Sequence, residues 1–169
     1  LNMFAINMNI LEGLTMALSR RKVFISHYKG DRIEVDAFIK AFSTVFISKV
    51  LGANDNYDFI SSTNTDYVMQ RIREKYLGDS TVTIVLIGSC THSRRYVDWE
   101  IKSSLQKGQD NRPNGLIGIL LPSQGNSAYL PPRLAANWTK EESNCYARCR
   151  IYPRSREELA ERFGFEAPT

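Results

Sequence analysis

The sequence predicts an α/β protein built on a flavodoxin-like, doubly wound parallel sheet of five strands, with helices on both faces. Two apolar runs, 82–87 and 115–122, have the composition of strands buried on both faces. Segments with helical spacing alternate with the strands, and right-handed crossovers then give a parallel sheet. No glycine-rich dinucleotide fingerprint or P-loop follows a strand, which favours the flavodoxin-like order 2-1-3-4-5 over the nucleotide-binding Rossmann order.

The first half of the chain supplies two strands and two helices. A short apolar strand over 22–27 ends in a polar cluster, and Asp31 marks the start of a helix predicted over 31–50 by its i, i+3/i+4 apolar spacing. A weaker strand at 57–61 is expected near an edge of the sheet. A polar loop follows, from which Asn64 or Thr65 caps a helix over 66–77.

The second half begins with the strand 82–87 and a helix over 96–107, separated by a polar loop. The strand 115–122 is followed by a loop-like segment over 123–142. A last strand over 146–152 precedes a terminal helix over 155–163, which opens with the capping box Ser155-Arg-Glu-Glu158.

Length and composition predict one globular domain. The chain has 169 residues, of which 43% are hydrophobic and 24% charged. We expect a single domain over 21–169 and an N-terminal extension over 1–20, helical or partly disordered. No apolar run reaches transmembrane length, and the first 20 residues lack the basic region of a signal peptide. The prediction is a cytoplasmic protein without membrane contact.

Net charge and cysteine content restrict the classes of ligand, the compartment and the metal sites to be expected. A net charge of +4 is mild, and without a dense basic run it suits an anionic small ligand or an acidic partner but not nucleic acid. Three cysteines without framework spacing favour a reducing compartment. Cys145 and Cys149 fall in or beside a strand, where four residues span roughly 13 Å, too far for one zinc ion. We expect no metal site.

Ligands of such a fold bind at the carboxyl ends of strands 1 and 3, where the strand order reverses. Two polar loops meet there, 26–31 and 89–95, and they carry both histidines, His27 and His92. These histidines either contact a ligand or are ordinary loop residues. Tyr28 is placed to stack on a ring, whereas Arg94 and Arg95 either hold phosphates or are solvated.

Glu100 lies in the helix after the third strand. Helical geometry places it about 60° from the centre of the sheet-facing stripe, on the boundary between core and cleft. Trp99 faces away from the sheet and suits a contact between protomers. From the residues alone, Glu100 is either a ligand-facing carboxylate or a common helix-start glutamate favoured by the helix dipole.

The segment 24–31 resembles the first strand and following loop of TIR domains. The segments 78–89 and 94–101 most closely resemble the TIR-like proteins of Thoeris anti-phage systems, the ThsB family. The resemblance covers about residues 22–120. In enzymatic TIR domains the helix after the third strand carries an aromatic-Cys-x-x-Glu pattern with a catalytic glutamate. Here it reads Tyr96-Val-Asp-Trp-Glu100, so Tyr replaces the usual Trp and Val the usual Cys.

The resemblance implies an NAD+ nucleosidase or ADP-ribosyl cyclase-like enzyme with NAD as substrate and no separate cofactor. Glu100 would be catalytic, and the substrate-binding residues would be Ser26, His27, Tyr28, Ser62, Asn64 and Tyr96. The loop 61–66 corresponds to the TIR loop that gates the site or joins protomers. Self-association through TIR–TIR contacts and a downstream effector reached through a nucleotide signal are also implied.

Three alternatives remain at this stage. A non-catalytic TIR-like scaffold shares all of these features except a use for Glu100. A receiver-like phosphoacceptor would need an aspartate at the end of the third strand, where this chain has Gly88-Ser-Cys. A nucleoside deoxyribosyltransferase, also flavodoxin-like with a catalytic glutamate, would prefer free deoxynucleosides to NAD.

Overall fold

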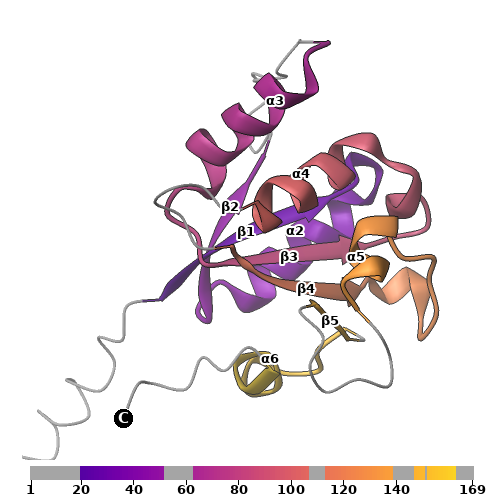
Figure 1. Ribbon diagram of the computed structural model, residues 1–169. Helices are drawn as coiled ribbons and strands as arrows, with labels where there is room; N and C mark the ends of the chain where they lie inside the picture. Colours follow the sequence, from indigo (N-terminus) through magenta and orange to yellow (C-terminus); the bar gives the residue numbers. More distant parts are fainter. Residues whose placement is uncertain (1–19, 52–62, 107–112, 139–146, 151, 163–169) are drawn as a thin grey trace, which may run out of the picture.

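The computed structural model describes residues 20–51, 63–106, 113–138, 147–150 and 152–162, which form one parallel sheet between two layers of helices (Figure 1). The strands are β1 (Arg21–His27), β2 (Phe46–Val50), β3 (Val82–Ile87), β4 (Gly115–Leu120) and β5 (Ala147–Arg150). Their order is β2-β1-β3-β4-β5, and all neighbours run parallel. The prediction of an α/β fold with a parallel sheet and helices on both faces is confirmed, whereas the strand beside β1 is 46–50 and not the predicted 57–61.

Helices cover both faces of the sheet (Figure 1). One face carries α2 (Arg32–Phe42) and α6 (Arg156–Arg162). The other carries α3 (Thr65–Ile72), its π-helical continuation η2 (Arg73–Leu77), α4 (Arg95–Leu105) and the short α5 (Pro132–Ala136). Single 3-10 turns follow three strands: η1 (Lys29–Asp31), η3 (Thr91–Ser93) and η4 (Pro122–Gln124).

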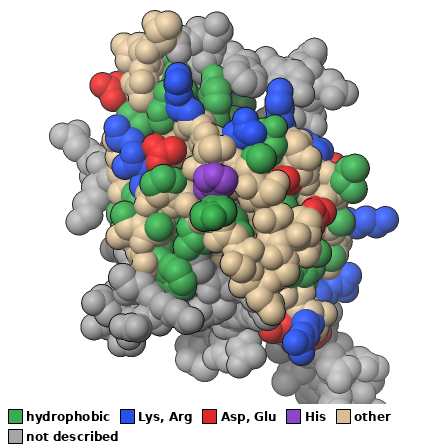
Figure 2. All heavy atoms as spheres, turned by 90° about the vertical axis from the view of Figure 1, so that its right-hand side faces the viewer, with side chains coloured by type: hydrophobic (Ala, Val, Ile, Leu, Met, Phe, Trp, Pro, Cys, Tyr) green, Lys and Arg blue, Asp and Glu red, His purple; other side chains and the backbone are tan. Residues whose placement is uncertain are grey.

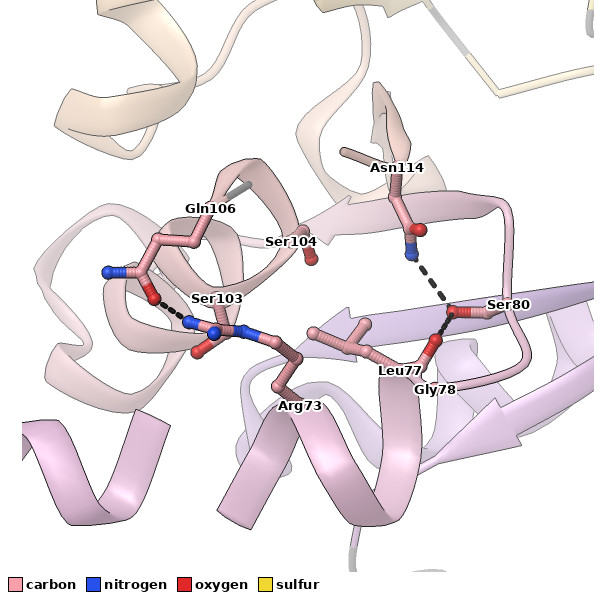
Figure 3. Close-up of a pocket in the computed structure, with 8 residues that line it drawn as sticks. All are labelled: Arg73, Leu77, Gly78, Ser80, Ser103, Ser104, Gln106 and Asn114. Atoms are coloured by element: carbon pink, nitrogen blue, oxygen red, sulfur yellow. Dashed lines mark hydrogen bonds between the residues drawn. The ribbon is translucent and has the colours of Figure 1, made fainter. Parts of the chain in front are cut away.

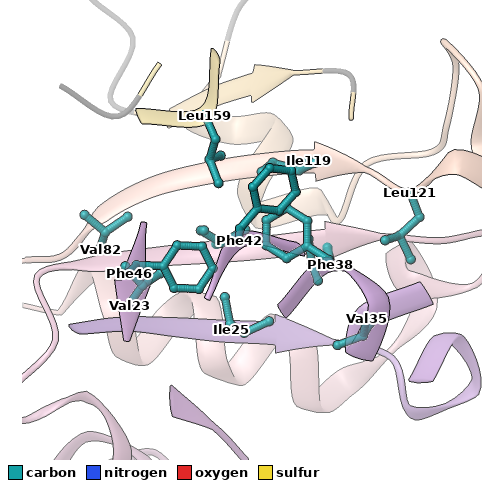
Figure 4. Packing of buried hydrophobic residues seen from close by; sticks show 12 residues of the cluster. Val23, Ile25, Val35, Phe38, Phe42, Phe46, Val82, Ile119, Leu121 and Leu159 are labelled. Carbon is teal, nitrogen blue, oxygen red and sulfur yellow. The ribbon is translucent and has the colours of Figure 1, made fainter. Parts of the chain in front are cut away.

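The core on the α2 side is rich in aromatic rings (Figure 4). Phe38 and Phe42 of α2 have ring centroids 4.8 Å apart, and Tyr152 packs edge-on against Phe38 at 5.7 Å. Leu159 of α6 joins the same cluster over Ile119. This burial fixes the orientation of β1, because Val23 and Ile25 must face α2.

The alternate residues of β1 therefore face α3 and α4. Phe24 packs with Val68, Ile72 and Leu77 under α3 and η2, and Tyr96 and Trp99 of α4 cover this cluster. Further along the sheet, Val97 and Ile101 of α4 pack on β3 and β4, together with Leu134 of α5. Ser26 is the next residue of β1 on this side, so the core packing directs its hydroxyl toward α4.

The predicted helix over 31–50 is wrong in its second half. Helix α2 ends at Phe42, a turn follows, and Phe46–Val50 forms the edge strand β2 beside β1. The apolar residues of this stretch fit a helical stripe and a strand equally well, but it holds the β-branched residues Thr44, Val45, Ile47 and Val50, which favour strands. The expected strand at 57–61 lies outside the described residues, as do residues 1–19.

Apart from α5, the remaining described elements agree with the predictions to within a few residues. Asn64 caps α3, since its Oδ1 accepts from the backbone N–H groups of Asp66 and Tyr67. Ser155 caps α6 by accepting from the Glu158 N–H at 3.1 Å. The segment predicted as loop over 123–142 contains α5. Among the described residues, no helix is long and apolar enough to cross a membrane.

Candidate active site

The two predicted loops meet at the carboxyl ends of β1 and β3. The Thr91 hydroxyl accepts a hydrogen bond from the Gly88 N–H at 2.8 Å and donates one to the Asp31 carboxylate at 3.3 Å. The guanidinium group of Arg94, in the loop after β3, lies over the ring of Tyr28, in the loop after β1. The prediction that these loops lie together at the point where the strand order reverses is confirmed.

Asp31 lies against the backbone at the end of β3. A β-carbon added to Gly88 would lie only 2.1 Å from Asp31 Oδ2, so a side chain at residue 88 would displace the Asp31 carboxylate. Asp31 precedes α2 as expected, but its side chain makes no capping hydrogen bond and contacts Thr91 instead. Burial raises the pKa of this carboxyl.

Glu100 is buried inside the domain on α4, with only 4% of its surface exposed. The Ser26 hydroxyl at the end of β1 donates a hydrogen bond to Glu100 Oε2, and Ser26 is itself fully buried. The helical angle predicted the rim of a cleft, but packing of Val97 and Ile101 on the sheet draws this side of α4 inward. Glu100 therefore meets β1 directly.

Burial raises the pKa of Glu100 from 4.5 to about 8, against the opposing effect of the Ser26 hydrogen bond. Glu100 is thus mostly protonated at neutral pH in the free protein. An approaching cation would favour the carboxylate form. A carboxyl group that titrates near neutrality beside the strand-order reversal has the properties of a catalytic group.

Tyr28 continues the extended path of β1, with φ −85° and ψ 131°, and is followed by η1. The guanidinium carbon of Arg94, the residue before α4, lies 4.0 Å from the centre of the Tyr28 ring. Ser26 and Tyr28 are two residues apart in an extended chain and so face the same side. The Tyr28–Arg94 pair therefore lies on the same side of the sheet as the Ser26–Glu100 pair, two residues further along the chain past the end of β1.

The other predicted site residues are spread over both faces of the sheet. Tyr96 is one helical turn before Glu100, and its ring packs edge-on against Trp99 at 5.2 Å. His27 is directed to the α2 side, where burial and then Arg32 lower its pKa. Asn64 caps α3, and Ser62 lies outside the described residues. The structure thus groups Ser26, Tyr28, Tyr96 and Glu100 on one side, and it does not bring His27 to that side.

Two expectations about neighbouring residues change. Trp99 was expected to face away from the sheet, but it is partly buried against the cluster under α3. His92 lies beside Tyr129, with ring centroids 5.4 Å apart. Figure 2 shows the face toward which the strands point in Figure 1, where a histidine stands among hydrophobic side chains and several Lys and Arg side chains lie around them.

Sequence reasoning did not single out Thr91, the link between the two loops. The sequence around Thr91 does not predict this role, because a threonine three residues after a glycine is an ordinary feature of a polar loop. Within the described residues, no group of three or more His, Cys, Asp or Glu side chains is arranged to hold a metal ion.

A separate small cavity lies at the amino ends of β3 and β4 (Figure 3). Its volume is about 30 Å³, enough for about one water molecule and far too small for a dinucleotide. Arg73 and Gln106 are hydrogen-bonded to each other at its mouth, and Asn114 donates to Ser80 at 2.9 Å across its wall. This cavity contains none of the predicted site residues.

The strand order and the helices on both faces define a flavodoxin-like α/β domain. Residues 24–126, more than half of the chain, match the family described as "Thoeris protein ThsB, TIR-like domain". The chain belongs to this family of Thoeris TIR-like proteins. The matched region contains β1 from Phe24 onward, β2 to β4, α4 and both loops of the candidate site.

One relative is similar over a shorter stretch. It is the "Putative cyclic ADP-D-ribose synthase ThsB1" of Bacillus cereus (strain MSX-D12), which is 42% identical over 55 residues. That stretch is 32% of this chain and 26% of the relative, so the chain spans about a quarter of the length of the relative it matches.

Proposed function

We propose that this protein cleaves the N-glycosidic bond of NAD and produces a nucleotide signal in bacterial anti-phage defence. The observation that carries the proposal is Glu100, a buried carboxyl group held by Ser26 where the strand order reverses. Membership of the Thoeris TIR-like family supports it, as does the similarity to the relative named "Putative cyclic ADP-D-ribose synthase ThsB1". Glu100 is the proposed catalytic residue.

The chemistry requires little beyond one carboxylate. Nicotinamide leaves from NAD carrying a positive charge that is neutralised as the bond breaks, so no general acid is needed. The ribose develops oxocarbenium-like charge, which a fixed carboxylate stabilises electrostatically. This is why a single glutamate replaces the two carboxyl groups of ordinary glycosidases. The cationic nicotinamide ring would itself lower the pKa of Glu100 and generate the carboxylate as the substrate binds.

The test is nicotinamide release and mass spectrometry of the products from NAD with wild type and Glu100→Gln. We expect Glu100→Gln to reduce the rate by about 100-fold or more, because it removes the charge that stabilises the transition state. Glu74→Gln is the matched control, since Glu74 is an exposed glutamate on η2 hydrogen-bonded to Gln70. Equal rates for Glu100→Gln and wild type would contradict a catalytic role.

The alternative is a TIR-like scaffold that binds partners without catalysis. It predicts no nicotinamide release from wild type even when the protein is assembled, for example at high concentration or on cross-linking. The resemblance to TIR enzymes implies an assembly with composite sites, so the assay should include self-associated protein. Hydrolysed ADP-ribose, a cyclic isomer and a conjugate differ in mass or chromatographic behaviour, so the same experiment assigns the product.

The proposed partners follow from the same activity. NAD is the substrate, copies of this chain associate through TIR–TIR contacts, and an effector with a nucleotide-sensing domain receives the product. The proposal includes neither nucleic acid nor a membrane as a partner. A single domain over 21–169 and a cytoplasmic location stay predictions. A gene for a nucleotide-sensing effector next to this one would support the Thoeris assignment.

A further inference from the structure

We propose that Arg94, held over the ring of Tyr28, binds the diphosphate of the dinucleotide substrate. This inference rests on the proposed function and assigns one residue to one part of the substrate. The guanidinium carbon of Arg94 lies 4.0 Å from the centre of the Tyr28 ring, within the range of a cation–π contact.

Arg94 is partly buried, and one of its guanidinium nitrogens lacks a hydrogen-bond partner. Its Nε is buried and has no hydrogen-bond partner. None of the ion pairs between described residues includes Arg94. Asp31 is near enough to interact with it electrostatically, yet the Asp31 carboxylate is hydrogen-bonded to Thr91 instead. A buried donor left unpaired is costly, which points to an acceptor that arrives with a ligand.

The contact with Tyr28 fixes the guanidinium group without using its hydrogen-bond donors. A guanidinium over an aromatic ring is held through its face, whereas its N–H donors lie in its plane. Those donors match the paired oxygens of a phosphate. Gly30 makes the arrangement possible, because a β-carbon there would lie 2.4 Å from the Tyr28 ring. The ring and the arginine are therefore positioned before the ligand binds.

The position of Arg94 relative to Glu100 fits the substrate. Tyr28 follows Ser26 by two residues on an extended chain, a step of about 6.6 Å. In NAD, the ribose that bears nicotinamide on its anomeric carbon bears the diphosphate on its 5′ carbon. A carboxylate at the anomeric centre and a guanidinium at the diphosphate must therefore be separated by about one sugar unit. Ser26, which contacts Glu100, and Tyr28, which contacts Arg94, are spaced along the backbone on the scale of one sugar unit.

Arg95 provides the matched control within the same sequence. It carries the same charge on the adjacent residue but is exposed, and its guanidinium carbon lies 5.8 Å from the centre of the Trp99 ring. General attraction of anions by the basic loop would depend on both arginines equally. A defined diphosphate site depends on Arg94 alone.

The experiment measures binding of ADP-ribose and of adenosine to wild type, Arg94→Gln, Arg94→Lys and Arg95→Gln by titration calorimetry. We expect Arg94→Gln to weaken ADP-ribose binding about 10- to 100-fold, the range for a lost charged hydrogen bond, and to leave adenosine binding unchanged. Arg94→Lys should retain part of the affinity, because it keeps the charge but loses the planar fork. Arg95→Gln should bind ADP-ribose like wild type. Thermal melts of the ligand-free variants control for folding.

The inference would be overturned if Arg94→Gln bound ADP-ribose as tightly as wild type does. It would also be overturned if Arg95→Gln weakened ADP-ribose binding as much as Arg94→Gln, or if wild type bound ADP-ribose no more tightly than adenosine. Nicotinamide release from NAD is measured in parallel. Arg94-dependent ADP-ribose binding without any cleavage would overturn the proposed function and leave the diphosphate site in place. Cleavage of NAD that does not depend on Arg94 would overturn the diphosphate site and leave the proposed function in place.

Discussion

Two buried polar clusters lie on the same face of the sheet and contact α4 one helical turn apart, at Glu100 and at Ser104. At the carboxyl edge, Ser26 donates to the Glu100 carboxyl group. At the amino edge, the side chains of Ser80, Thr83, Ser104 and Asn114 form a hydrogen-bonded chain. The Ser104 hydroxyl also donates to the Glu100 backbone carbonyl at 2.9 Å, so the two clusters share one helix.

The clusters differ in charge and in how well their polar atoms are paired. The amino-edge chain is neutral, and it ends where the Ser80 hydroxyl donates to the Leu77 carbonyl at 3.0 Å. Such a satisfied network is buried at little cost and fixes the position of a helix. The carboxyl-edge cluster holds an ionisable group in a site that disfavours its charge. The neutral amino-edge chain therefore stabilises the fold, whereas ionised Glu100 lowers the stability of the folded state and is available for chemistry.

The largest expected effect is on stability. The pKa of Glu100 in the folded protein, about 8, exceeds the ordinary value of 4.5, so the folded state binds the proton more tightly than the unfolded state. The stability that this proton provides is fully present below about pH 4.5 and is lost as the pH rises to about 8, by at most about 5 kcal/mol. Glu100→Gln cannot ionise, so its stability relative to wild type should increase by several kcal/mol across this window.

Urea denaturation at pH 5 and pH 8 measures this difference. Glu74→Gln, on an exposed glutamate, should show no comparable increase between the two pH values. A Glu100→Gln protein with the same pH dependence as wild type would show that Glu100 is not the buried titrating group.

The next effect is on activity. If the Glu100 carboxylate is the catalytic form, kcat/KM for NAD should fall about tenfold per pH unit below a pKa of about 8. Between pH 9 and pH 6 this amounts to roughly 100-fold. Ser26→Ala should move the profile to higher pH, because the Ser26 hydrogen bond lowers the pKa of Glu100. Initial rates of nicotinamide release measure both profiles, and a flat profile for wild type would count against the assignment.

The smallest effect is expected at the amino edge. Thr83→Val keeps the shape of the side chain but removes the hydroxyl that lies 2.8 Å from Ser104 Oγ and 3.2 Å from Asn114 Nδ2. We expect a loss of about 1–3 kcal/mol in the free energy of unfolding, the same at pH 5 and pH 8, with kcat/KM changed only slightly. Denaturation and rate measurements on this variant test the contrast. A pH-dependent loss, or a rate as low as that of Glu100→Gln, would show that the clusters are not separate.

The sequence was sufficient for the parallel sheet because continuous apolar runs such as 82–87 have few other interpretations. It failed at 43–50, where Val45, Phe46 and Val50 satisfy both helical and strand spacing, and only pairing with β1 decides between them. Local spacing cannot include that tertiary contribution.

The candidate site was predictable to a similar degree. The rule for open α/β sheets located the two loops, and the family pattern located Glu100. The depth of Glu100 was not predictable, because it depends on how far α4 packs onto β1 and not on helical angle alone. The direction of His27 was implicit in strand alternation: once Ser26 faces α4, its neighbour faces α2.

The contact between Gly88 and Asp31 has a mechanical consequence. The Asp31 carboxylate occupies the space that a side chain at residue 88 would take, and it accepts a hydrogen bond from Thr91. These contacts link the loop after β1 to the loop after β3. Tyr28 belongs to the first loop and Arg94 to the second. The two loops should therefore shift as one body, so that a displacement which opens a path to Glu100 also carries Arg94 with it.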